Sequence, residues 1–216
     1  QGTGNPQILP FHYGGVMMLS SSIMTNETKN FLKRWDANDS LVWNYVYTFS
    51  NAFNTDFGFI TFDSSGNFHL FNRIFNPSIY SFDSSANLIG IKEFNSEYVL
   101  SQVISDAQGR IYGCGEGFFG NKRRGRIFCL SSVDSVAWAY RNNAGWLDDQ
   151  ANINNFSHLT ISQDSNLWYL GLLRSPSIDK FNNELTVFLK MDPEGEQPCY
   201  MEPDTIELID LNLSHV

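Results

Sequence analysis

One short segment of this chain brings aromatic rings and positive charges together in a way that could bind a ligand. It holds two aromatic residues and then four cations, namely Phe118, Phe119, Lys122, Arg123, Arg124 and Arg126. Guanidinium groups pair with carboxylates and other anions, and aromatic rings pack on apolar surfaces. We predict a site here for an anion, a glycan or an acidic protein neighbour, against the plainer alternative of a solvated hairpin tip.

Trp146 is a further candidate for this site. It lies in an insertion over residues 141–155 that is rich in Asn and Asp, as is typical of a loop projecting between strands. An exposed indole ring can anchor a protein partner or a sugar ring. We therefore add Trp146 to the predicted ligand-binding residues.

Carboxylates outside the regular turns offer a different chemistry. There are four of them: Glu97, Glu116, Asp148 and Asp149. Glycoside hydrolysis requires only two such acids at a suitable separation. Loop acids in an acidic protein are usually solvated instead, so a glycan-active enzyme is the alternative hypothesis and not the first.

The sequence holds no coherent set of metal ligands or nucleophiles. Its histidines have no fixed metal-binding spacing: His12, His69, His158 and His215. The turn at residues 63–66 supplies one carboxylate, where calcium loops gather several, and therefore predicts a structural turn. The three cysteines form no CxxC pair, and the sequence contains no Gly-x-Ser-x-Gly motif. We predict no metal, no cofactor and no catalytic residue.

Composition sets broad limits on partners and location. The chain has 216 residues and a net charge of −9, which disfavours a protein that binds nucleic acid by neutralising phosphates. The sequence has no run of 18 apolar residues, so we expect no membrane insertion. With 42% hydrophobic residues, the chain can bury a core without metal or disulfide staples.

A repeated pattern predicts how these residues are positioned. An apolar strand, an Asp- or Ser-headed turn and an aromatic-bearing strand recur at residues 60–70, 103–113 and 159–169. The Asp side chain can bond the backbone two residues on, and Gly accepts the positive φ of a tight turn. This pattern predicts antiparallel hairpins in an all-β chain.

A second turn pattern lies between these copies. Its heads, Asp36, Asp83, Ser131 and Asp192, are spaced by 47, 48 and 61 residues, close to the length of one propeller blade. We predict one β-propeller domain over residues 1–216, or a segment of a larger propeller, with about four blades of four antiparallel strands. The expected blades are 6–48, 58–95, 99–141 and 156–202, and residues 203–216 form a closing or extra strand. A β-sandwich is disfavoured because its strands would not repeat with this period.

These turns resemble the quinoprotein-type (PQQ-like) β-propeller repeat, in which an Asp-x-x-Gly turn leads into a strand ending in Tyr or Trp. The resemblance is best at residues 60–90 and 103–138. It implies the scaffold only, since the chain is too short for the eight-bladed dehydrogenases of that family and no calcium-plus-quinone set can be matched.

The sequence therefore favours a non-catalytic structural or recognition module that binds a protein neighbour in an assembly or a surface glycan. A surface adhesion domain and a virion appendage subunit, such as a tail or spike, are the examples we expect. Such a module would be extracellular, on a cell surface or in a virion, and could be an oligomer. The alternative is an extracellular propeller enzyme that acts on glycans through loop carboxylates.

Overall fold

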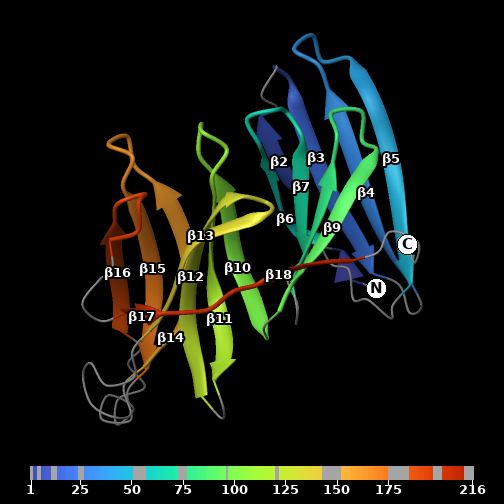
Figure 1. Ribbon diagram of the computed structural model, residues 1–216. Helices are drawn as coiled ribbons and strands as arrows, with labels where there is room; N and C mark the ends of the chain where they lie inside the picture. The colour runs from blue at the N-terminus through green and yellow to red at the C-terminus, as the bar shows by residue number, and fades with distance from the viewer. Residues whose placement is uncertain are drawn as a thin grey trace.

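The computed structural model of the chain is built from antiparallel β-strands (Figure 1). It describes residues 2–3, 6–10, 14–23, 27–50, 57–72, 77–95, 97–119, 122–142, 152–174, 185–196 and 201–211. Within these ranges every regular element is a strand. The predicted all-β fold is thereby confirmed.

Four sheets follow one another along the chain and are arranged as the four blades of a β-propeller, as predicted. Blade 1 contains β1 (Gly2–Thr3), β2 (Gln7–Pro10), β3 (Val16–Ile23), β4 (Glu27–Trp35) and β5 (Leu41–Ser50). Blade 2 contains β6 (Phe57–Phe62), β7 (Phe68–Asn72), β8 (Ser78–Phe82) and β9 (Leu88–Phe94). Blade 3 contains β10 (Tyr98–Ser105), β11 (Ile111–Phe119), β12 (Lys122–Ser132) and β13 (Ser135–Asn142). Blade 4 contains β14 (Asn152–Ile161), β15 (Leu167–Arg174) and β16 (Leu185–Met191).

The C-terminal segment, residues 201–211, returns along the outer edges of blades 3 and 2 and is called the tail. Its strand β17 (Met201–Pro203) pairs with β13, and its strand β18 (Leu208–Asp210) pairs with β9. The tail crosses the front of the molecule in Figure 1. Its described residues thus add one strand to each of these two blades and do not pair with blade 1.

The hairpin turns form as the sequence predicts. The Asp63 carboxylate accepts hydrogen bonds from the backbone N–H groups of Ser65 and Asn67, at 2.8 and 2.9 Å. Gly66 closes this turn with a φ of 82°. Asp106 and Gly109 repeat the arrangement in blade 3. These turns are local structures, so each can be recognised from four or five consecutive residues.

Three apolar clusters fill the spaces between consecutive blades. The first joins blades 1 and 2, the second blades 2 and 3, and the third blades 3 and 4. Each blade thus has a forward face, toward the next blade in the chain, and a backward face, toward the preceding one. Blades 2 and 3 are buried on both faces. Among the described residues, none of these clusters joins blade 4 to blade 1.

Candidate protein interface

The predicted basic site lies on the hairpin of β11 and β12, and the structure uses part of it internally. Arg126 is only 3% exposed. Its Nε donates to the carboxylate of Asp204 in the tail, and its guanidinium lies 5.3 Å from the centre of the Tyr98 ring. The backbone carbonyl of Arg126 accepts the Tyr98 hydroxyl at 2.9 Å. Arg126 therefore fixes the tail to blade 3.

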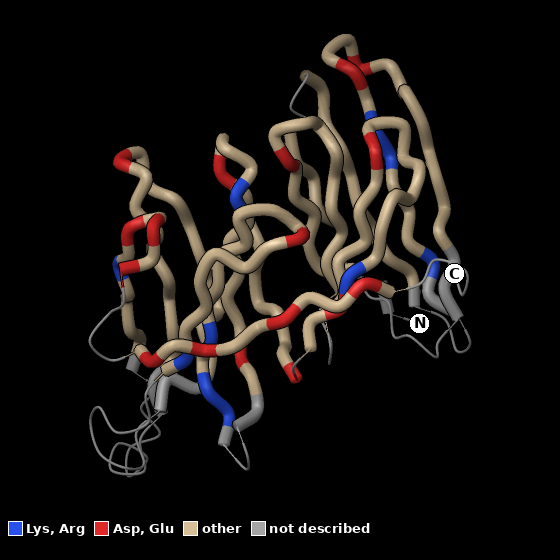
Figure 2. Tube along the Cα trace, in the orientation of Figure 1, with Lys and Arg blue, Asp and Glu red and all other residues tan. Residues whose placement is uncertain are grey.

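Arg124 takes part in the same attachment. Its Nη1 lies 2.8 Å from Oε1 of Glu202, and Nε of Arg141 lies 2.6 Å from the same oxygen. Figure 2 shows these charges as acidic positions along the tail beside basic positions of blade 3. An arginine held by a carboxylate of its own chain has less capacity for an external anion.

Among the described basic side chains of this hairpin, that of Arg123 is the most exposed, at 59%. Its Nη1 lies 3.2 Å from Oε1 of Glu116. Strand pairing places Phe118 opposite Arg123 and Phe119 opposite Lys122, and for Phe118, Phe119 and Lys122 the structure describes the backbone only. Trp146, Asp148 and Asp149 lie outside the described residues. The binding role of this segment stays a prediction.

The acids of the glycosidase hypothesis are only partly described. Glu116 is paired with Arg123, as above, and Glu97 is exposed just before β10. The described residues contain no group of three or more His, Cys, Asp or Glu side chains that could hold a metal ion. His158 is exposed on β14, and His12 and His215 fall outside the described ranges.

His69, Ser81 and Asp63 form a Ser-His-Asp arrangement that the sequence did not reveal. His69 Nδ1 lies 3.0 Å from Ser81 Oγ, and His69 Nε2 lies 3.6 Å from Asp63 Oδ2. Burial alone would raise the pKa of Asp63, but the neighbouring His69 and Asn67 lower this pKa to about 2. Ser81 and His69 are buried on the forward face of blade 2. A serine nucleophile must meet its substrate, so this burial indicates a structural polar network.

Two cavities lie among the hairpin turns of neighbouring blades. One is lined by residues of blades 1, 2 and 3, and the other by residues of blades 3 and 4. Their volumes are about 230 and 310 Å³, and both are lined by Ser105 and Asp106. Asp106 already accepts hydrogen bonds from Nε of Arg110 at 2.7 Å and from the Tyr112 hydroxyl at 3.0 Å. The Asp106 carboxylate thereby stabilises the hairpin of β10 and β11.

Among the described residues, the two most exposed large apolar side chains, Phe188 and Ile8, lie on the outer faces of the two end blades. Positions can be matched between blades because one hairpin in each blade closes on a residue pair with the same separation: Pro10–Val16, Phe62–Phe68, Ser105–Ile111 and Ile161–Leu167. Ile8 lies two residues before the first member of its pair in blade 1. The residues at the same position in blades 2, 3 and 4 are Ile60, Val103 and Leu159. Those three are 3%, 5% and 3% exposed, whereas Ile8 is 64% exposed.

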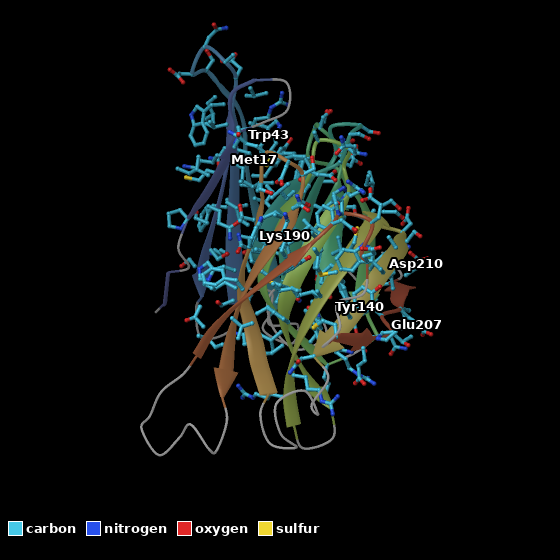
Figure 3. The ribbon with its side chains drawn as sticks, turned by 90° about the vertical axis from the view of Figure 1, so that its left-hand side faces the viewer. Met17, Trp43, Tyr140, Lys190, Glu207 and Asp210 are labelled. Atoms are coloured by element: carbon cyan, nitrogen blue, oxygen red, sulfur yellow. The ribbon has the colours of Figure 1, made fainter. Side chains whose placement is uncertain are left out.

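The forward face of blade 4 shows the same contrast. Phe188 pairs with Leu170 and corresponds to Leu32, Ile79 and Ile127 of the other blades, which are each 0% exposed. Phe188 itself is 68% exposed. Figure 3 views the molecule from the blade 4 side and labels Lys190 of this face. The Nζ of Lys190 lies 5.6 Å from the ring centre of Trp168, a half-exposed side chain.

The two end faces thus have the composition of a blade interior and the exposure of a surface. No protein-family model and no curated protein matches this sequence. The resemblance to the quinoprotein-type repeat therefore stays a prediction. Within the described residues, no helix is long and apolar enough to cross a membrane.

Sequence reasoning missed the end faces, although a signal for them exists. Ile8 and Phe188 occupy positions of the repeat at which every other blade has a buried aliphatic residue. The sequence shows that these residues belong to a blade interior. The missing information is that blade 1 has no preceding blade, and blade 4 no following blade, within the clusters described above.

Proposed function

We propose that this chain is a non-catalytic structural module that binds a protein neighbour through the outer faces of its end blades. The observation that carries the proposal is the exposure of Ile8 and Phe188 at positions that are buried in the other blades. Water-exposed apolar area of this kind is characteristic of protein interaction surfaces. The face of blade 1 is extended by Val16, Val42 and Val46, all of them exposed.

The chemistry of the two faces supports a protein partner. Aromatic and aliphatic side chains form the centre of both faces, with Trp168 and Phe188 on blade 4 and Ile8 and Val16 on blade 1. Protein interfaces are enriched in aromatic residues and depleted of charge at their core. Lys33 lies on the face of blade 1 and Lys190 on the face of blade 4, and a lysine can bury its stem while its ammonium group stays hydrated.

The described polar clusters also favour this proposal over catalysis. Ser81 and His69 of the Ser-His-Asp arrangement are buried between blades 2 and 3, and Arg123, Arg124 and Arg126 of the basic hairpin are engaged with Glu116 and with the tail. The polar residues of the Ser-His-Asp arrangement and the arginines of the hairpin thus have partners within the chain, and a catalytic role is not needed to explain them.

The proposal is tested by measuring the mass of the chain by light scattering together with its binding of an apolar fluorescent dye. The variant to compare with wild type carries Ile8→Asp and Phe188→Asp. We expect this variant either to dissociate an assembly formed by wild type or, where wild type is monomeric, to bind less dye. Both side chains are exposed, so circular dichroism should show an unchanged fold.

The matched control is Ile89→Asp, which removes a 51% exposed apolar side chain from blade 2. It should leave both the mass and the dye signal of wild type unchanged. The proposal is overturned by a wild-type monomer whose dye binding equals that of the double variant. It is equally overturned by an assembly that the double variant leaves intact.

A further inference from the structure

We infer that the protein neighbour is a second copy of this chain, and that two chains close one eight-bladed ring. The forward face of blade 4 would pack on the backward face of blade 1 of the other copy, and the reverse contact would form at the same time. This inference rests on the proposed function and names its partner. The three blade contacts within the chain support it.

Each of those three contacts joins a forward face to a backward face through equivalent positions. Leu32 and Ile60 belong to the cluster between blades 1 and 2, Ile79 and Val103 to the next, and Ile127 and Leu159 to the last. The residues at the same two positions that remain exposed are Phe188 and Ile8. They are the two halves of a fourth contact of the same kind.

The neighbouring positions extend this correspondence. On the backward face of blade 1, Val16 occupies the position of Phe68, Ile111 and Leu167, which are all 0% exposed in their blades. On the forward face of blade 4, Trp168 occupies the position of Met17, His69 and Tyr112, which are at most 1% exposed. A blade from a second copy would therefore cover both faces in the way that blades cover one another within the chain.

The number of copies follows from the geometry of a ring. Within one chain, blades 1 and 4 lie at opposite sides of the molecule, with blades 2 and 3 between them (Figure 1). Two copies of four blades give eight, the upper end of the usual range of four to eight for propellers, and three copies would exceed it. The two copies would be related by a two-fold axis along the central axis of the ring. Both new contacts are then identical, and none of the four end faces stays exposed.

The experiment measures the mass of the chain by light scattering over a concentration series. Wild type should have twice the chain mass of 24.6 kDa. Ile8→Asp and Phe188→Asp, each alone, should be monomers, because either change places a carboxylate in both contacts of the ring. Ile89→Asp, on blade 2, should remain a dimer.

Mixing the two single variants provides the sharper test. A mixed dimer has one contact with both substitutions and one contact with neither, so an equimolar mixture should recover a dimer that neither variant forms alone. A contact between two copies of the same face would not be recovered in this way. Absence of recovery, or growth of wild type beyond a dimer with concentration, would overturn the eight-bladed ring.

The eight-bladed ring and the proposed function can be disproved separately. A wild-type monomer at every concentration overturns the ring. If that monomer binds apolar dye at its end faces and loses the signal in the Ile8→Asp/Phe188→Asp variant, the proposed function stands with another protein as partner. If the dye signal is unchanged as well, both proposals are wrong.

Discussion

Arg126 and Asp204 form an ion pair in which both side chains are almost fully buried, at 4% and 2% exposure. The pair joins β12 of blade 3 to the tail, across 78 positions of sequence. Arg141 Nη1 adds a second cation at 3.6 Å from the other oxygen of Asp204. The tail is thus held by buried charge in addition to strand pairing and the packing of Ile206 between blades 2 and 3.

Removing the carboxylate of this pair should destabilise the fold strongly. Asp204→Ala leaves the buried guanidinium of Arg126 without its main counter-charge, and breaking such a pair costs about 3–5 kcal/mol. The measurement is the free energy of unfolding in urea. The matched control is Asp210→Ala in the same tail, because Asp210 is 83% exposed and pairs with Lys92. An exposed pair contributes at most about 1 kcal/mol, so equal effects of both variants would contradict this assignment.

The same pair shows where prediction from sequence ends. The segment with Arg124 and Arg126 stands out as a possible ligand site because it concentrates cations. Its partners Glu202 and Asp204 are far away along the chain, and the pairing becomes visible only when β17 is placed beside β13. A contact between distant segments has no local signal, in contrast to the turn at Asp63, which is made by consecutive residues.

The end faces show a second limit of the sequence. The repeat predicts that Phe188 is a blade-interior residue like Ile79, and in chemical type it is. Exposure depends on whether another blade lies opposite, which is a property of the assembled fold and not of the repeat. The propeller could therefore be predicted from local turns and repeat length, whereas the candidate interface could not.

Stability should depend on the charge of Asp63 at low pH. The pKa of this carboxyl is lowered from 3.8 to about 2 in the folded state, so its ionised form stabilises the fold above pH 3.8. This contribution is lost as the pH falls from 3.8 through about 2. Asp63→Asn keeps a side-chain oxygen for the turn but removes the charge. We expect the variant to be less stable than wild type at pH 7 and the difference to shrink in that acidic window.

Asp83→Asn provides the comparison for this prediction. Asp83 heads a similar turn, and a hydrogen bond from the Asn87 side chain also lowers its pKa, but no histidine is among the groups that shift it. We expect a smaller change with pH in thermal unfolding scans. An Asp63→Asn variant whose stability follows wild type at every pH would show that the neighbouring imidazole of His69 contributes nothing.

Cys114 and Cys129 should be unreactive in the folded chain. Both are free and buried in the cluster between blades 3 and 4, and burial raises the pKa of the Cys129 thiol to about 12. The reactive species is the thiolate, which is scarce at such a pKa. In a Cys199→Ser background, a thiol reagent should label neither residue in native buffer and both in concentrated guanidinium. Rapid labelling of the native chain would mean that this cluster opens readily.

Gly113 of β11 should tolerate no side chain, because the ring of Phe128 occupies its space. A Cβ built on Gly113 would lie 2.1 Å from the Phe128 ring, at a position where blade 2 has Leu70 and blade 4 has Tyr169. In blade 3, the space that Leu70 and Tyr169 fill in the other two blades is thus filled by Phe128 of the neighbouring strand β12. Gly113→Ala should destabilise the fold by about 1–3 kcal/mol, the usual cost of overpacking.

Gly90 of β9 is the matched control for this substitution. A Cβ there meets no other atom within 4 Å, and Ala is favoured over Gly in a strand because it loses less conformational entropy on folding. Gly90→Ala should therefore be neutral or slightly stabilising in urea unfolding. If Phe128 is the cause of the Gly113 effect, then adding Phe128→Leu to Gly113→Ala should recover part of the lost stability, since the smaller side chain makes room for the new methyl group. No recovery would mean that the backbone, and not the ring, requires glycine at this position.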